Sequence, residues 1–123
     1  MSSNKEVIRS FIHAWSRLDA NELADFFSDD GTYHNMPSKP VVGKRNIKLF
    51  IEKFIANWNS TSWDILTIVE DGDTVICERL DITRTSTGDV HLPCCGVFEM
   101  QDGKIHIWRD YFDLNTYMKG ITP

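Results

Sequence analysis

SWDILTIVEDGDTVICERLDITRTSTGDVHLPCCGVFEMQDGKIHIWRDYFD, residues 62–113, is the stretch that decides the fold. The turn signals DGD, STGD and QDGK divide it into four runs of strand length and strand composition. Gly72, Gly88 and Gly103 fall in these three turns, where a tight hairpin favours positive φ. Tight turns join antiparallel neighbours, so the stretch predicts a four-stranded antiparallel meander.

The first half of the chain has the pattern of helices instead. Apolar residues recur at spacings of three and four over residues 5–18 and again over residues 45–58, which predicts two amphipathic helices. Ser3, with a glutamate three residues later, has the capping-box pattern that starts the first helix. Asp19 repeats this signal before ANELADFF, which predicts a short helix over residues 20–27.

Three shorter segments complete the predicted outline. TYHNM is expected to be extended, the two prolines of PSKPVVGK indicate a loop, and LNTYMKG can form a closing turn of helix. Helices followed by a long antiparallel sheet define an α+β domain. The order of elements also resembles the cone-shaped fold shared by nuclear transport factor two, ketosteroid isomerase and scytalone dehydratase. That resemblance implies a strongly curved, mainly antiparallel sheet packed on the N-terminal helices to form a cone with an internal pocket.

Composition indicates a globular protein and narrows the choice of partner. The 123 residues are 41% hydrophobic and 25% charged, which we interpret as one domain over residues 1–123. A formal net charge of -5 argues against nucleic acid and anionic membranes, because both attract clustered Lys and Arg. Charged residues interrupt the N-terminal apolar residues, so we expect neither a signal peptide nor a membrane span. A small neutral ligand fits better.

Cysteine and histidine usage predicts no metal site and no cofactor. Cys94 and Cys95 point to opposite faces of any strand they occupy, and we interpret all three cysteines as reduced thiols of a cytoplasmic protein. The four histidines lack the spacing of metal ligands. The sequence also has no glycine-rich phosphate loop and no GxSxG nucleophile turn.

Alternation along two strands places charged groups on apolar faces. In TVICERLDITRT, Arg79 and Asp81 share a face with a valine and a cysteine, so this pair is expected to be partly buried. In IHIWRDYFD, Asp110 shares a face with Trp108 and Phe112. A carboxylate between two aromatic side chains needs a partner or a raised pKa.

Tyr33 and Asn35 share a face of their extended segment, where a hydroxyl and an amide can hold a water or a ligand oxygen. Each feature also has a purely structural interpretation. Arg79 and Asp81 can form a solvated surface pair, and Asp110 can pair with the adjacent arginine. The combination is more specific, because an arginine between two carboxylates lets one stay ionised while the other holds a proton.

Four segments together resemble limonene epoxide hydrolase: YHNMP, ERLD, GVF and WRDYFDL occur in the same order and at similar spacing. By motif, the resemblance implies Asp81 as general acid, Asp110 as general base and Arg79 as the bridge between them. It implies that Tyr33 and Asn35 hold the attacking water, and that the protein is a homodimer. The pocket wall is then expected to consist of Thr83, Leu92, Cys94, Trp108, Phe112 and Tyr117.

Three functions follow from these residues. The first is a cofactor-independent epoxide hydrolase that adds water to a small hydrophobic epoxide in one step and gives a vicinal diol. The second is an isomerase or cyclase of the ketosteroid isomerase or polyketide cyclase type. The Arg79 bridge argues against that function, because a lone base in an apolar pocket suits it better. The third is a non-catalytic module that binds a hydrophobic ligand.

Overall fold

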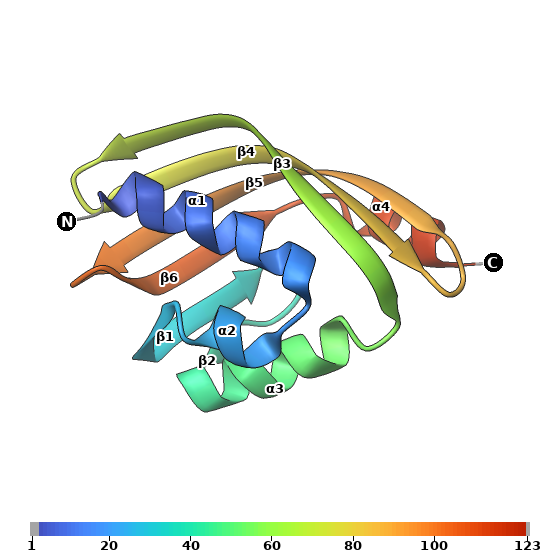
Figure 1. Ribbon diagram of the computed structural model, residues 1–123, viewed down its shortest axis with the longest axis horizontal. Helices are drawn as coiled ribbons and strands as arrows, with labels where there is room; N and C mark the ends of the chain where they lie inside the picture. Colours follow the sequence, from blue (N-terminus) through green and yellow to red (C-terminus); the bar gives the residue numbers. More distant parts are fainter. Residues whose placement is uncertain (1–2, 123) are drawn as a thin grey trace.

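The computed structural model describes residues 3–122 as a curved sheet packed against helices (Figure 1). The helical elements are α1 (Asn4–Ala14), the 3-10 turn η1 (Trp15–Arg17), α2 (Ala20–Ala24), α3 (Lys44–Phe54) and α4 (Leu114–Ile121). The strands are β1 (Phe27–Asn35), β2 (Val41–Val42), β3 (Trp58–Asp71), β4 (Thr74–Thr85), β5 (Asp89–Gln101) and β6 (Lys104–Tyr111).

The strands of the described residues form one sheet in the order β2-β1-β6-β5-β4-β3. β3 to β6 pair with their sequence neighbours as antiparallel hairpins, which confirms the predicted meander. β1 extends the sheet by pairing with β6 in parallel, and β2 adds a short antiparallel edge inside the predicted loop. The predicted α+β fold with a mainly antiparallel sheet is therefore confirmed, with one parallel pair that the sequence did not predict.

Local signals start the first two helices where the sequence predicts. Ser3 Oγ accepts a hydrogen bond from the backbone amide of Glu6 at 3.2 Å. Asp19 Oδ1 accepts one from the amide of Asn21 at 3.0 Å. These amides have no partner within the first helical turn, so the side chains satisfy donors that would otherwise face only water.

Two predicted helices prove too long. α2 ends at Ala24 rather than continuing to Phe27, because Phe27 already pairs with β6. α3 ends at Phe54, and Trp58 begins β3 opposite Thr85. In both places an aromatic residue that fits a helical spacing belongs to a strand, since packing on the sheet outweighs local periodicity.

Two of the three turn glycines adopt the predicted positive φ, 59° at Gly72 and 77° at Gly103. Gly88 does not, and its turn is closed by a hydrogen bond from the Thr85 amide to the Gly88 carbonyl at 2.9 Å. Gly88 is needed for a different reason. A Cβ at this position would collide with the backbone of Gly120 in α4. The glycine thus allows α4 to approach the β4–β5 hairpin closely.

A β-bulge interrupts the alternation predicted for β6. The pairing with β5 shifts between Ile105 and Ile107, which makes His106 the extra residue. Strict alternation would place His106 on the face of Trp108, but its Nδ1 atom lies 3.2 Å from Ser28 Oγ instead. Beyond the bulge, alternation holds to the end of β6. The inward positions that matter for the site are therefore kept.

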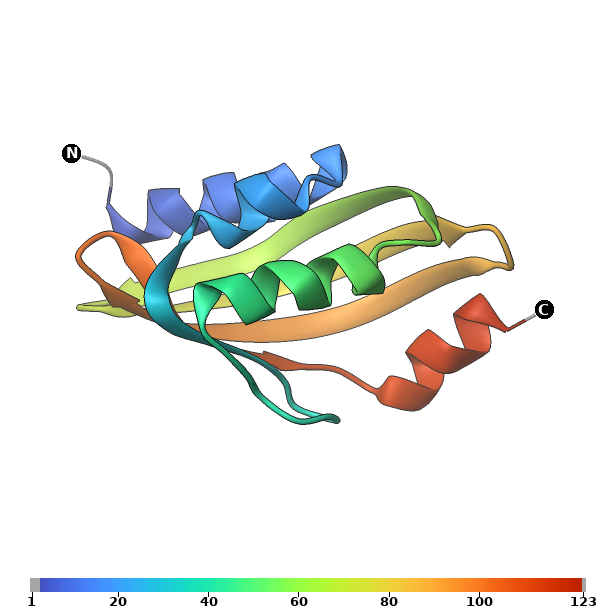
Figure 2. The same cartoon turned by 90° about the horizontal axis from the view of Figure 1, so that it is seen from below.

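Helices and sheet enclose an interior at the centre of the fold. Figure 2 shows α1, α2 and α3 on the same side of the sheet, with α4 beyond the end of β6. α1 packs against β3 and β4, α3 against β1, and α4 against β5. The main core cluster lies between the N-terminal helices and the sheet, and a small cluster of Val90, Leu92 and Cys94 packs against α4. This arrangement agrees with the predicted cone.

Candidate active site

Three buried charged side chains meet inside the sheet. Arg79 Nε lies 2.9 Å from Asp81 Oδ1, and Arg79 Nη1 lies 2.8 Å from Asp110 Oδ1. Arg79 Nη2 donates to both partners, at 3.1 Å to Asp81 Oδ2 and 2.6 Å to Asp110 Oδ2. The exposed fractions are 1% for Arg79, 5% for Asp81 and 3% for Asp110. A solvated surface pair is thereby excluded, and one guanidinium reaches both carboxyl groups.

Strand register and one glycine bring these groups together. Arg79 and Asp81 are two residues apart on β4, so their side chains leave the same face. Asp110 is on β6, and the intervening strand β5 presents Gly96 opposite it. A Cβ at Gly96 would lie 3.1 Å from Arg79 Nη1 and 2.9 Å from Trp108 Nε1. Glycine at this position therefore gives the guanidinium room to cross β5 and reach Asp110.

Aromatic rings enclose the guanidinium. Its carbon atom lies 4.4 Å from the ring centre of Trp63 and 5.6 Å from that of Trp108. Cation–π attraction in such desolvated surroundings contributes up to about 2 kcal/mol. Burial opposes the charge of Arg79, but the two carboxylates more than offset it and hold the pKa of Arg79 well above its usual value. Arg79 thus stays charged inside the domain.

Parallel pairing of β1 with β6 adds Tyr33 and Asn35 to the same site. Tyr33 is opposite Trp108, and Asn35 is opposite Asp110. The ring of Tyr33 stacks on Trp108 with centres 4.3 Å apart and planes within 6°. Burial, helped by the charge of Asp110, raises the pKa of Tyr33 well above its usual value, so its hydroxyl stays protonated at neutral pH. A neutral hydroxyl and an amide therefore accompany Asp110.

Burial shifts Asp81 toward its protonated form. Burial raises the pKa of Asp81 to about 6; the charge of Asp110 acts in the same direction, and Arg79 opposes both. The thiol of Cys94 lies 3.4 Å from Asp81 Oδ2 as a weak donor. A carboxyl group with this pKa holds a proton far more often near neutral pH than an exposed aspartate does.

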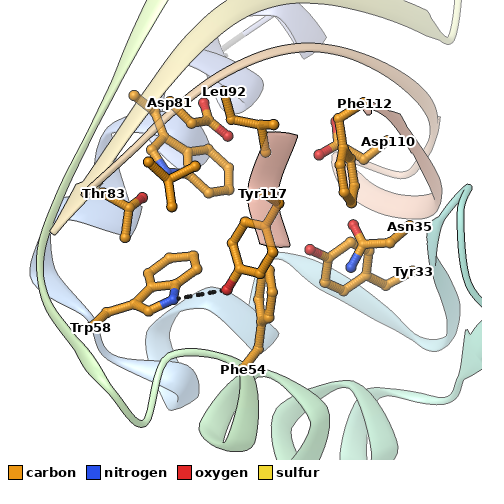
Figure 3. Close-up of a pocket in the computed structure, with 12 residues that line it drawn as sticks. Tyr33, Asn35, Phe54, Trp58, Asp81, Thr83, Leu92, Asp110, Phe112 and Tyr117 are labelled. Carbon is orange, nitrogen blue, oxygen red and sulfur yellow. Dashed lines mark hydrogen bonds between the residues drawn. The ribbon is translucent and has the colours of Figure 1, made fainter. Parts of the chain in front are cut away.

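Both carboxyl groups border a small, partly enclosed cavity. Figure 3 shows Tyr33, Asn35 and Asp110 on one side of this cavity. Thr83 and Trp58 lie on the other side (Figure 3). The complete lining consists of Tyr33, Asn35, Phe54, Trp58, Trp63, Asp81, Thr83, Val90, Leu92, Asp110, Phe112 and Tyr117.

The lining differs from the sequence expectation at two positions. Cys94 and Trp108 do not line the cavity. Cys94 lies behind it in contact with the carboxyl of Asp81, and Trp108 is wholly buried, stacked between Tyr33 and Phe98. Alternation predicts which face of a strand a side chain leaves, but not whether that side chain reaches the cavity or is buried beneath its wall. The expected wall residues that do line the cavity are Thr83, Leu92, Phe112 and Tyr117.

Sequence reasoning misses four lining residues. Helical spacing assigns Phe54 and Trp58 to a packed helix face, and Val90 carries no chemical signal. Trp63 fits a core or a pocket equally well from its strand position alone. The cross-strand partner of Trp63 is the signal that could have identified it as a lining residue, because Trp63 pairs with Asp81 and so lies beside the charged cluster. The hairpin turn at residues 71–73 sets this register, apart from the irregularity between Ile65 and Thr67.

Charged groups outside the cluster make separate contacts. Arg109, the sequence neighbour of Asp110, pairs with Glu99 and takes no part in the bridge. Within residues 3–122, no group of three or more His, Cys, Asp or Glu side chains could hold a metal ion. None of the helices in that range is both long enough and apolar enough to span a bilayer.

The fold and the buried cluster place two carboxyl groups at one cavity of a cone-shaped α+β domain: the first has a pKa raised to about 6, and the second lies beside a hydroxyl and an amide. The chain belongs to the limonene-1,2-epoxide hydrolase family. Residues 2–122 match the family described as "Limonene-1,2-epoxide hydrolase catalytic domain". The family that the sequence motifs predict is thereby confirmed.

Known relatives agree with this assignment. Epoxide hydrolase EphG from Mycobacterium tuberculosis is 30% identical over 114 residues, which is 93% of this chain and 76% of that protein. The solved structure of an M. tuberculosis LEH-like epoxide hydrolase has a TM-score of 0.82 at 29% identity, covering 96% of this chain and 88% of that one. A protein of ketosteroid isomerase-like fold from Catenulispora acidiphila, 20% identical with a TM-score of 0.87, covers 96% and 94% and shows the shared fold alone.

Proposed function

We propose that this protein is an epoxide hydrolase that adds water to a small hydrophobic epoxide in one step and releases a vicinal diol. The observation that carries the proposal is the bridge made by Arg79, which holds Asp81 and Asp110 where both border one small cavity. Family membership and the likeness to an epoxide hydrolase support hydrolysis of an epoxide as the reaction class.

The two carboxyl groups take opposite roles in this proposal. Ring opening requires a proton for the epoxide oxygen and removal of a proton from the attacking water. Asp81, with a pKa of about 6, donates the first proton as general acid. Asp110 accepts the second as general base, while Tyr33 and Asn35 beside it orient the water. The water oxygen bonds to a ring carbon as the carbon–oxygen bond of the epoxide breaks.

Arg79 keeps the buried charge balanced throughout this reaction. Before ring opening, the cluster holds one neutral carboxyl, one carboxylate and one guanidinium, and its net charge is zero. After ring opening, Asp81 and Asp110 have exchanged protonation states and the net charge is still zero. Uncompensated charge in such a buried site costs several kcal/mol, so this balance lowers the barrier. Arg79 Nη2 contacts both carboxyl groups and stabilises whichever one is ionised.

The cavity wall favours a small and mostly apolar substrate. Phe54, Leu92 and Phe112 are among the apolar residues of the wall, and the cavity is small. Bound in this space, the epoxide and the water react at fixed distance and orientation. Such positioning is worth up to about 7 to 11 kcal/mol in favourable cases. It therefore supports catalysis without a covalent intermediate or a cofactor.

Two other functions are compatible with the fold, and each has a distinguishing feature. An isomerase or cyclase uses a lone carboxylate base, whereas Asp110 here shares its guanidinium partner with Asp81. A non-catalytic binding module needs no proton-holding carboxyl beside its ligand. Neither alternative accounts for the paired carboxyl groups as directly as epoxide hydrolysis does.

Diol formation from limonene oxide and cyclohexene oxide tests the proposal. Wild type is compared with Asp110→Asn and Asp81→Asn, and Asp64→Asn on the exposed side of β3 serves as the matched control. We expect wild type and the control to form diol, and each site variant to lose at least about 100-fold in rate. Diol formation that persists in Asp110→Asn would remove Asp110 as the base. A folded wild type that hydrolyses no epoxide would favour the two alternatives.

Three further expectations from the sequence stay predictions: a homodimer, a cytoplasmic location and independence from any cofactor. Sedimentation equilibrium measures the oligomeric state directly, and a monomer at micromolar concentration would contradict the predicted homodimer. Activity that is unchanged after extensive dialysis against a chelator is the expected result for the third.

A further inference from the structure

A second polar region lies in the wall of the cavity, away from the carboxyl groups. The indole Nε1 of Trp58 donates a hydrogen bond to the hydroxyl oxygen of Tyr117 at 3.2 Å, and Figure 3 shows both side chains at the cavity. This bond leaves the hydroxyl proton of Tyr117 to be donated elsewhere. Among residues 3–122, that proton has no acceptor. Burial raises the pKa of Tyr117, so the hydroxyl keeps this proton at neutral pH.

Thr83 adds a second hydroxyl to the same wall. Its Oγ1 lies 2.7 Å from Thr61 Oγ1, which also accepts a hydrogen bond from Trp63 Nε1 at 2.9 Å. If Thr61 donates to Thr83, the proton of Thr83 is available to a ligand. If Thr83 donates instead, its oxygen remains able to accept. Thr83 can therefore adapt to a ligand group, whereas Tyr117 can only donate.

These hydroxyls stand at a distance from the reacting groups. Thr83 follows Asp81 by one inward-facing position on β4, which is roughly 7 Å along a strand. Trp58, the partner of Tyr117, lies further along, since it pairs with Thr85. A ligand whose epoxide contacts Asp81 would therefore reach Tyr117 and Thr83 only with the opposite end of its body.

Tyr117 is held in place by the packing of α4. A Cβ at Gly120 would lie 2.7 Å from Val90 Cγ2, so this glycine lets the helix sit directly on β5. Thr87 Oγ1 also donates a hydrogen bond to the carbonyl of Ile121 at the end of α4. The ring centres of Tyr117 and Phe54, which both line the cavity, lie 5.7 Å apart. The donor is thus positioned before any ligand arrives.

We propose that the preferred substrates are epoxides carrying a hydrogen-bond acceptor oxygen, such as a ketone, ether or hydroxyl, at the end of the apolar body opposite the ring. Tyr117 donates to this oxygen, and Thr83 completes the contact when the group is a hydroxyl. The inference rests on the proposed epoxide hydrolase function and specifies its substrate class. A pure hydrocarbon epoxide would fill the same space but leave the Tyr117 donor without an acceptor, which weakens binding.

One matched pair of substrates isolates this oxygen. Limonene oxide carries an isopropenyl group, and its acetyl analogue replaces the terminal CH2 of that group by oxygen at nearly constant shape. The measured quantity is the ratio of kcat/KM for the acetyl analogue to kcat/KM for limonene oxide. It is determined for wild type, for Tyr117→Phe, and for Tyr111→Phe as the control, since Tyr111 is an exposed tyrosine outside the cavity.

We expect a ratio of about three to ten in wild type and in Tyr111→Phe, the value of one neutral hydrogen bond, and a ratio near one in Tyr117→Phe. Hydrolysis of both substrates with the same ratio in wild type and Tyr117→Phe would overturn the inference and leave the proposed function standing. If neither substrate is hydrolysed, the proposed function fails. In that case calorimetry measures the dissociation constants of both compounds. Binding of the acetyl analogue about three to ten times tighter than limonene oxide in wild type, but not in Tyr117→Phe, is expected, and equal preference in both proteins would overturn the inference.

Discussion

Arg79 donates to both carboxylate oxygens of Asp110, from Nη1 to Oδ1 at 2.8 Å and from Nη2 to Oδ2 at 2.6 Å. The two residues are 31 positions apart and belong to strands that are not neighbours. Their contact passes over β5 at Gly96, where a Cβ would lie only 3.1 Å from Arg79 Nη1. The buried cluster of Arg79, Asp81 and Asp110 therefore depends on three strands at once.

Replacing Arg79 by alanine should destabilise the protein in a pH-dependent way. The two buried carboxyl groups would lose Arg79, the one cation that pairs with them among residues 3–122, and breaking such a buried pair costs about 3–5 kcal/mol in the free energy of unfolding. Without the guanidinium, the folded state takes up protons more readily than the unfolded state, so stability returns as pH falls. Urea unfolding of wild type and Arg79→Ala at pH 5 and pH 7 measures both effects.

Arg109→Ala is the control for that experiment, because Arg109 forms a partly exposed pair with Glu99 whose loss should cost at most about 1 kcal/mol. An equal loss of stability at both pH values in Arg79→Ala would mean that the carboxyl groups are not ionised against Arg79 in the folded protein.

Activity should fall as pH rises through about 6. In the proposed mechanism Asp81 must be protonated to act as general acid, and burial raises the pKa of Asp81 to about 6. Above it, the protonated fraction and with it kcat/KM should decrease about tenfold per pH unit. A pH profile of kcat/KM for cyclohexene oxide between pH 5 and 9 checks this. A profile that is flat or rising from pH 6 to 8 would contradict the role of Asp81.

Cys94 should tune that profile through its contact with Asp81. Its thiol donates to Asp81 Oδ2 at 3.4 Å, and this hydrogen bond lowers the pKa of Asp81. Cys94→Ala removes the donor and should move the alkaline limb of kcat/KM upward by at most about one pH unit. Cys94→Ser keeps a donor and should leave the limb near its wild-type position. Identical shifts in both variants would assign Cys94 a packing role only.

Tyr33→Phe should lower kcat with little effect on folding. Phenylalanine keeps the stacking on Trp108 but loses the hydroxyl that orients the water in the proposed mechanism. We expect kcat to fall by about 10- to 100-fold and the free energy of unfolding to change by no more than about 1.5 kcal/mol. Tyr111→Phe provides an exposed control. Wild-type kcat in Tyr33→Phe would exclude the hydroxyl from catalysis.

Local sequence patterns were sufficient for the meander and for the pairing of Arg79 with Asp81. Hairpin turns join neighbours in the sequence, and alternation sets which side chains share a face. The same patterns do not reveal the parallel pairing of β1 with β6, because it joins segments that are far apart in the sequence, such as Asn35 and Asp110. That pairing, rather than any local signal, brings Asn35 beside Asp110.

Local sequence patterns also do not predict how deeply a side chain is buried or where a β-bulge falls. Trp108 and Cys94 lie on the predicted face, yet one is stacked beneath Tyr33 and the other lies behind Asp81. No turn residue in the sequence marks the bulge at His106. The bulge shifts the alternation of β6 at His106, and the residues after it keep the predicted faces. The contact of Arg79 with Asp110 could be expected only from the family resemblance, since it depends on how three strands pack.

The central claim is direct attack of water on the epoxide, with Asp110 as base rather than as nucleophile. A single turnover of limonene oxide in oxygen-18 water, with enzyme in excess over substrate, tests it most directly. Direct attack predicts that each diol molecule formed in this first turnover contains one oxygen-18 atom. Unlabelled diol would show that the new oxygen came from a carboxylate of the protein through a covalent ester. That result would contradict the mechanism.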